Sequence, residues 1–171
     1  EVSVVPDGRG AVFRYDTPDQ ARNLSYLSFA DKKVTPVLSG AADELMPRVS
    51  PDSKWLAYVS DESGTAEVYV RPFPGSGGRV AVSTGGGSAP IWSRDGKKLF
   101  YRSETKLMAA TVTTTSPEVT GTPEFAVTDR TVQFEGTYVS HPYHQNFDVA
   151  PDGKFVMLQP GVGDSRQLIV A

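Results

Sequence analysis

The chain has 171 residues, of which 39% are apolar and 22% are charged, a composition typical of one folded domain and not of a disordered chain. The 17 Lys and Arg and 20 Asp and Glu give a net charge of −3 without a basic cluster, which argues against a nucleic-acid partner, and no apolar run is long enough to insert into a membrane. The absence of cysteine excludes disulfides and thiolate chemistry, and the 16 Gly and 13 Pro favour many short strands joined by turns.

A turn signature recurs four times along the chain. Its aspartates are 45, 43 and 57 residues apart. In such a tripeptide Pro sets φ, Asp accepts hydrogen bonds from backbone N–H groups just downstream, and Gly supplies a positive φ. The four copies are Pro6-Asp7-Gly8, Pro51-Asp52-Ser53, Arg94-Asp95-Gly96 and Pro151-Asp152-Gly153. We therefore predict that Asp7, Asp52, Asp95 and Asp152 have structural roles in hairpin turns.

Short strand-like segments surround each turn. In chain order they are 2–5, 11–15, 23–27 and 34–38; 47–50, 55–59, 67–71 and 79–83; 90–93, 99–102, 107–112 and a segment within 125–134; and 147–150, 155–158 and 167–170. No window has the apolar spacing of an amphipathic helix, so essentially no helix is expected. Four strands in about 43 residues is the pattern of a propeller blade.

The sequence therefore predicts an all-β chain forming a single β-propeller domain over 1–171, with about four blades of four-stranded antiparallel sheet. The repeats fall at approximately 1–42, 43–86, 87–135 and 146–171. A β-sandwich is the alternative, but its strands need not repeat a turn at one fixed phase. Aromatic residues at matching phases are expected to pack between blades and not to bind sugars. They are Phe13, Trp55, Tyr58, Trp92, Phe100, Tyr101 and Phe155.

Segments 47–74, 85–101 and 147–155 resemble the WD40-like (PD40) repeat of TolB-type propellers, and in particular the C-terminal propeller of bacterial serine/threonine kinases. Arg94 in place of Pro and Ser53 in place of Gly depart from the pattern, and a turn can absorb both changes. Propellers of this family commonly have six or more blades. The resemblance thus implies that the chain is the C-terminal part of a six- to eight-bladed ring. The alternative is a complete chain that closes on itself or pairs with a second copy through open blade edges.

An enlarged loop between residues 128 and 146 carries the two histidines of the chain. In a propeller this loop is expected at the mouth of the central channel, together with turns and loops that give the mouth a mildly acidic rim. The predicted ligand-contact residues are His141, Tyr143, His144, Asp43, Glu44, Asp61, Glu62 and Ser88. His141 and His144 have metal-ligand character, but no third ligand lies near them in sequence, so no metal site is predicted. Polar and aromatic residues that decorate a surface loop are the favoured interpretation over a metal site.

No catalytic residues are predicted, because the sequence has neither a Gly-x-Ser-x-Gly elbow nor kinase signatures. The favoured function is a non-catalytic binding or sensor module, without cofactor, for a protein, peptide or small ligand. The resemblance implies an extracytoplasmic or periplasmic location in a bacterium. Two alternatives stay open: a TolB-like envelope scaffold that works through its rim, and the propeller domain of a prolyl-oligopeptidase-like peptidase.

Overall fold

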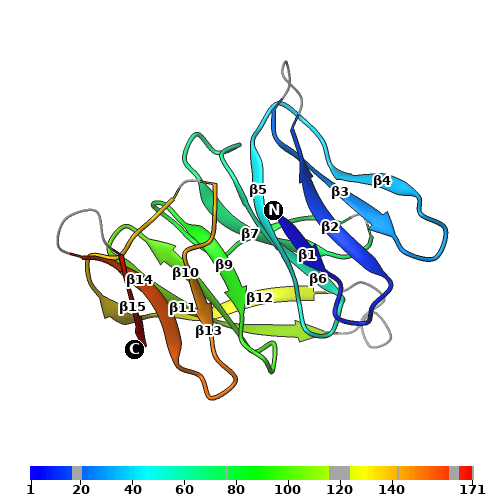
Figure 1. Cartoon of the computed structure of the whole chain (residues 1–171). Coiled ribbons are helices and arrows are strands. Elements are labelled where there is room, and N and C mark those ends of the chain that lie inside the picture. The colour runs from blue at the N-terminus through cyan, green and yellow to red at the C-terminus, as the bar shows by residue number, and fades with distance from the viewer. Residues whose placement is uncertain (17–20, 76, 116–123, 142, 162–165, 171) are drawn as a thin grey trace.

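The computed structural model describes residues 1–16, 21–75, 77–115, 124–141, 143–161 and 166–170. These residues form four antiparallel sheets and no helix (Figure 1), which confirms the all-β prediction. No helix of the described chain is therefore a candidate for crossing a membrane. The strands are β1 (Val2–Val4), β2 (Gly10–Tyr15), β3 (Asn23–Ser28), β4 (Val34–Leu38), β5 (Glu44–Val49), β6 (Trp55–Ser60), β7 (Glu67–Pro72), β8 (Val80–Ala81), β9 (Ser88–Trp92), β10 (Lys98–Ser103), β11 (Lys106–Thr115), β12 (Glu124–Glu135), β13 (Phe147–Val149), β14 (Phe155–Pro160) and β15 (Arg166–Val170).

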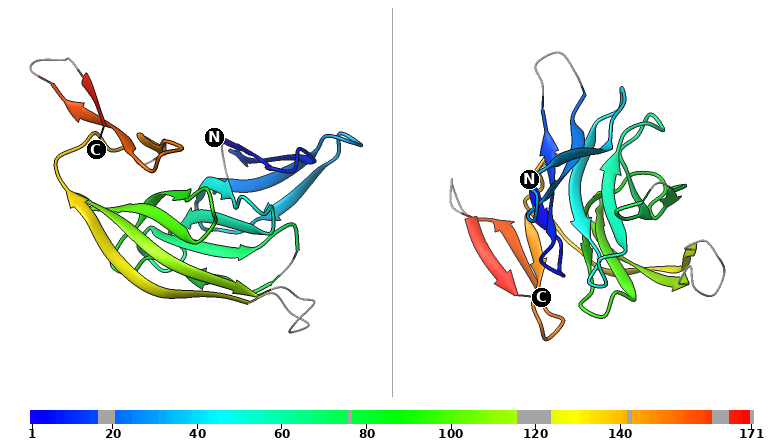
Figure 2. Two further views of the ribbon diagram at one scale, coloured as in Figure 1. Left: turned by 90° about the horizontal axis from the view of Figure 1, so that it is seen from below. Right: turned by 90° about the vertical axis from the view of Figure 1, so that its right-hand side faces the viewer.

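Each sheet is a simple meander of neighbouring strands. The orders are β1-β2-β3-β4, β5-β6-β7-β8, β9-β10-β11-β12 and β13-β14-β15. The first strand of each sheet lies innermost, and the sheets follow one another around an arc, so that the first and last sheets come back toward each other (Figure 2). This arrangement is a β-propeller with three four-stranded blades and one blade of three described strands.

The four repeated turns share one local geometry. In each, the aspartate Oδ1 accepts a hydrogen bond from the backbone N–H two residues downstream, at 3.0 to 3.2 Å. The residue after the aspartate has a positive φ, and in the second turn this residue is Ser53, with φ 60°. The Oγ of Ser53 accepts a hydrogen bond from the N–H of Asp7 at 3.2 Å, and its carbonyl accepts one from Arg9. Serine replaces glycine here because its side chain ties the first blade to the second.

The core lies between the blades. One cluster joins the first and second sheets and includes Val12, Leu24 and Tyr58. A larger cluster joins the second, third and fourth sheets, where the ring of Phe125 packs 5.3 Å from Trp55 and 6.1 Å from Trp92. The aromatic residues expected between blades are buried except Phe13, which is half-buried at the end of the arc.

The inner strands β5 and β9 contain the same irregularity. Met46 and Ala89 both have φ 52°, both precede a proline, and the pairing register shifts beside each. Such a bulge bends a strand and re-aims the side chains that follow it. Because the same bulge occurs in both blades, Arg48 and Ile91, each two residues later, are directed alike.

The second turn offers a test of its aspartate. In Asp52→Ala the N–H of Lys54 and the hydroxyl of Ser50 lose their common acceptor. We expect the free energy of unfolding to fall by about 1–2 kcal/mol, measured by urea denaturation with tryptophan fluorescence. Asp129→Ala, on an exposed stretch of β12, is the control and should change this free energy by less than about 0.5 kcal/mol. Equal denaturation midpoints for Asp52→Ala and the unmodified chain would contradict the assignment.

Candidate functional site

The predicted ligand-contact residues gather where the inner strands begin. Glu44 and Ser88 are the first residues of β5 and β9. The N–H of Asp43 donates to Asp61 Oδ1 at 2.8 Å, and Ser88 lies beside a small hollow shared with the loop histidines. We call this group the rim: Asp43, Glu44, Asp61, Glu62, Ser88, His141, Tyr143 and His144.

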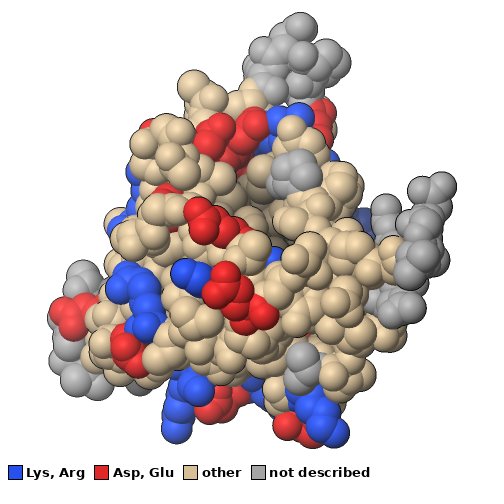
Figure 3. Space-filling view, turned by 90° about the vertical axis from the view of Figure 1, so that its left-hand side faces the viewer, with Lys and Arg blue, Asp and Glu red and all other residues tan. Residues whose placement is uncertain are grey.

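Two of the four acidic side chains of the rim, Asp43 and Glu62, are engaged with arginines. Arg22 Nη1 lies 2.5 Å from Asp43 Oδ2, and this hydrogen bond raises the pKa of the Arg22 guanidinium. Arg79 forms an ion pair with Glu62. On the face of the molecule in Figure 3, acidic side chains run along the middle and basic side chains lie mainly toward the edges. The paired carboxylates of the rim offer little uncompensated charge to a ligand.

The two histidines stack on each other. Their ring centroids are 4.5 Å apart with an interplanar angle of 28°, and the N–H of Tyr143 donates to His141 Nδ1 at 3.1 Å. The guanidinium of Arg22 lies 4.5 Å from the centre of the Tyr143 ring. Among the described residues, no three His, Cys, Asp or Glu side chains gather as a metal site would require. Through the contact of Tyr143 with Arg22, the loop that precedes β13 reaches the first blade across the rim.

Glu44 is the rim residue with the most unusual environment. Its side chain is buried, with 6% of the residue exposed, and burial raises its pKa from 4.5 to about 7. Ser60 Oγ donates to Glu44 Oε1 at 3.3 Å, while Oε2 has no hydrogen-bond partner among the described residues. The negative charges of Glu62 and Asp61 add to the same shift.

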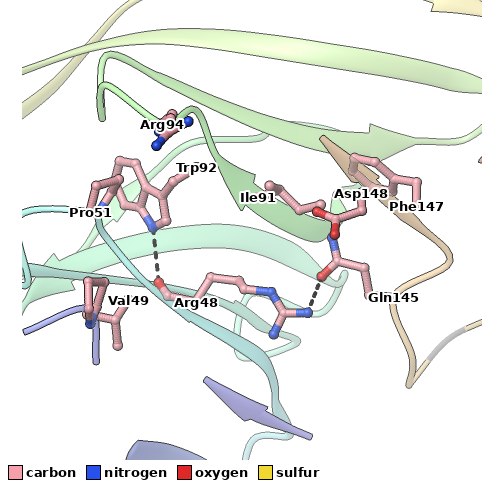
Figure 4. Close-up of a pocket in the computed structure, with 10 residues that line it drawn as sticks. Arg48, Val49, Pro51, Ile91, Trp92, Arg94, Gln145, Phe147 and Asp148 are labelled. Atoms are coloured by element: carbon pink, nitrogen blue, oxygen red, sulfur yellow. Dashed lines mark hydrogen bonds between the residues drawn. The ribbon is translucent and has the colours of Figure 1, made fainter. Parts of the chain in front are cut away.

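A cavity of about 600 Å³ lies at the other end of the inner strands (Figure 4). Its walls come from the last residues of β5 and β9, from β13 and from the first three repeated turns. Sequence reasoning did not predict this axial cavity. Its lining residues are Pro6, Arg48, Val49, Pro51, Ile91, Trp92, Arg94, Gln145, Phe147 and Asp148.

The repeat itself contained a signal for this cavity. Ser3, Arg48, Ile91 and Asp148 are spaced by 45, 43 and 57 residues, as the turn aspartates are. They therefore occupy one position of the repeat, and the last three line the cavity. Arg94, where the other turns have proline, lines it too. The repeat keeps its turn chemistry and changes its side chains where they face the axis.

Arg48 is the main polar feature of the cavity. Its Nη2 donates to Gln145 Oε1 at 2.6 Å and its Nη1 donates to the carbonyl of Pro47 at 3.0 Å (Figure 4 shows the first contact). Burial lowers the pKa of this guanidinium, while Glu1 and Asp148 act in the opposite direction. Within the described chain no carboxylate forms an ion pair with Arg48.

The raised pKa of Glu44 predicts how stability depends on pH. Between pH 4.5 and about 7 the folded protein keeps a proton that the unfolded chain releases, so the free energy of unfolding falls as pH rises through this window. Glu44→Gln keeps an acceptor for Ser60 and carries no charge. We expect it to raise the free energy of unfolding by about 1–3 kcal/mol at pH 8 and to have little effect at pH 4.

Urea denaturation at the two pH values measures this difference. Glu104→Gln, at an exposed position, is the matched control. A Glu44→Gln variant that is no more stable than the unmodified chain at pH 8 would show that Glu44 is not held protonated by burial.

Comparison with known proteins finds similarity in structure. No protein-family model and no curated protein matches the sequence. TolB from Acinetobacter baumannii matches with a TM-score of 0.70 and 18% identity, over 99% of this chain and 39% of that one. Hydrazine synthase from Kuenenia stuttgartiensis matches with a TM-score of 0.65 and 15% identity, over 99% of this chain and 58% of that one.

A puromycin-hydrolyzing peptidase from Mycobacterium tuberculosis also matches, with a TM-score of 0.65 and 16% identity, over 99% of this chain and 29% of that one. The chain thus spans less than two thirds of the length of each of these structures. Proteins as different as these share an architecture, and an architecture alone does not specify a function. The chain is therefore a β-propeller whose blades are arranged as in part of TolB and part of this peptidase.

Proposed function

We propose that this chain is a non-catalytic binding module that takes its ligand in the axial cavity. The observation that carries the proposal is a cavity of about 600 Å³ in which apolar walls surround a few polar groups. Ligand sites in proteins commonly have this size and this composition. A protein, peptide or small molecule would enter from the end of the axis where the repeated turns lie.

The charges of the two ends favour the cavity over the rim. At the rim Asp43 and Glu62 are paired with arginines. In the cavity, the hydrogen bonds of the Arg48 guanidinium to described residues go to neutral oxygens, those of Gln145 and Pro47. A polar group that is shielded from water and lacks some of its hydrogen-bond partners is stabilised most when a complementary ligand supplies them.

The lining also favours binding over catalysis. It contains no serine, threonine, cysteine or histidine, so it presents none of the common nucleophiles of covalent catalysis and no imidazole base. Both histidines of the chain lie in the rim. Asp148, the one acidic residue of the lining, accepts the N–H of Val149 at 2.8 Å. We propose that any chemistry coupled to binding takes place outside this chain.

The resemblance to kinase-linked propellers supports a finer proposal: a sensor in an extracytoplasmic or periplasmic compartment, where ligand binding is read by another domain. The likeness to TolB and to a peptidase supports the two other settings, an envelope scaffold and a substrate gate. A Gly-x-Ser-x-Gly hydrolase segment in the same polypeptide would favour the gate.

Association through a blade edge is a second candidate, supported by the fourth sheet. Its outer described strand, β15, exposes Leu168 at 68% and Val170 at 63%. An exposed apolar edge strand is a template for pairing with another chain. Light scattering tests this candidate, because concentration-dependent association that Leu168→Lys abolishes would support it.

A tryptophan placed in the axial cavity tests the main proposal. Ile91→Trp should fill the cavity and block ligands, whereas Val132→Trp adds the same side chain on β12, where the native valine is 50% exposed. Ligand-observed NMR with a mixture of small aromatic acids, amides and amines provides the measurement, and circular dichroism checks the fold. We expect binding signals with the unmodified chain and Val132→Trp, and at least about a tenfold weaker affinity with Ile91→Trp. Signals that survive in Ile91→Trp, or none with the unmodified chain, would refute it.

A further inference from the structure

Arg48 has N–H groups left for a ligand of the axial cavity, and Gln145 lies beside it. A guanidinium has five N–H groups, and Arg48 uses Nη1 and Nη2 on the oxygens of Pro47 and Gln145. The side-chain amide nitrogen of Gln145 is buried and has no hydrogen-bond partner among the described residues. Both side chains line the cavity, and their mutual hydrogen bond of 2.6 Å holds them side by side (Figure 4).

The charge of the lining has the sign opposite to that of the chain. Arg48 and Arg94 face one acidic residue, Asp148, in a molecule whose net charge is −3. Glu1, which lies outside the lining, acts on Arg48 more strongly than Asp148 does; its Oε1 accepts the backbone N–H of Gln145 at 3.2 Å, and its Oε2 is buried without a hydrogen-bond partner among the described residues. One net positive charge among the lining side chains suits a ligand with a single negative charge.

The apolar part of the lining lies next to these donors. Trp92 is fixed by a hydrogen bond of 3.0 Å from its Nε1 to the carbonyl of Arg48, and Ile91 and Phe147 also line the cavity. A ligand that fits both parts carries an anionic group beside an apolar or aromatic group. The planar fork of an arginine matches a carboxylate in particular.

We propose that Arg48 and Gln145 form a carboxylate-binding site in the axial cavity, which takes a ligand with an apolar group next to its carboxylate. This inference rests on the proposed function, because it names the ligand class of the same cavity. The carboxylate accepts hydrogen bonds from the free N–H groups of Arg48, and Gln145, whose amide oxygen accepts from Nη2, holds the guanidinium in place. Trp92, Ile91 and Phe147 contact its apolar neighbour.

Paired probes that differ only in this group test the site. N-acetyl-phenylalanine and N-acetyl-phenylalaninamide share every apolar atom, and isothermal titration calorimetry measures both. We expect the amide to bind at least about tenfold more weakly than the acid. Equal affinities of acid and amide, or no binding of the acid at millimolar concentration, would overturn the proposal.

Three variants locate the binding. Arg48→Gln should weaken the binding of the acid by about tenfold or more and leave the affinity for the amide unchanged. Asp148→Asn removes a negative charge near Arg48 and should raise the affinity for the acid by about twofold to tenfold. This variant keeps the test decisive if Arg48→Gln does not fold. Arg79→Gln, which removes an arginine of the opposite end, is the matched control. Loss of acid binding in Arg79→Gln, or an unchanged affinity in Asp148→Asn, would refute the assignment.

A carboxylate of this kind has two sources, a peptide C-terminus and a small organic acid. The peptide Gly-Ala-Phe with a free C-terminus and 3-phenylpropionate represent them, and the tighter of the two identifies the source. The inference and the proposed function fail in different ways. Equal binding of acid and amide that Ile91→Trp abolishes would refute the carboxylate site alone, whereas binding that Ile91→Trp does not change would refute the cavity as the binding site.

Discussion

Each sheet of this chain must be buried against its neighbour, and the arc of blades and the shape of its axis follow from that packing. A meander of short strands has two faces, and a single blade cannot cover both. Here Phe125, from the outer strand of the third blade, packs against Trp55 of the second and Trp92 of its own blade. Phe155 of the fourth blade packs 4.9 Å from Phe100 of the third. Each blade therefore completes the core of the next, and the arc follows from that stacking.

Polar ties at the inner strands keep the blades in register. Ser3 Oγ accepts the N–H of Val49 at 3.0 Å, joining β1 to β5. The hydrogen bond from Trp92 to the carbonyl of Arg48 joins β5 to β9 at the same level of the axis. These contacts are buried or half-buried, where hydrogen bonds cost most if they are broken. They also fix the backbone from which the cavity side chains project, so stability and the shape of the site have a common origin.

The two ends of the axis differ in how their charges are compensated. At the rim the arginines lie beside carboxylates, and the loop before β13 is tied to the first blade by Tyr143 on Arg22. At the other end of the axis, where the repeated turns lie, Arg48 donates hydrogen bonds to the side-chain amide oxygen of Gln145 and to a backbone carbonyl. The same loop thus does two things: it closes contacts across the rim and, through Gln145, it positions the guanidinium that faces the cavity.

The blades could be predicted from the sequence, because the repeated Asp turns and the alternating apolar residues act over a few neighbours. The sequence also placed the predicted residues at one end of the strands, since loops at equivalent positions of a repeat share one face. The sequence did not predict that Asp43 and Glu62 are paired, that Glu44 is buried, or that a cavity lies at the opposite end. Those properties depend on side chains from different blades, and on a loop whose length the repeat does not set. The sequence shows that one position of the repeat is held by four different residues, Ser3, Arg48, Ile91 and Asp148. Only the arrangement of the blades around a common axis shows that the last three line one cavity.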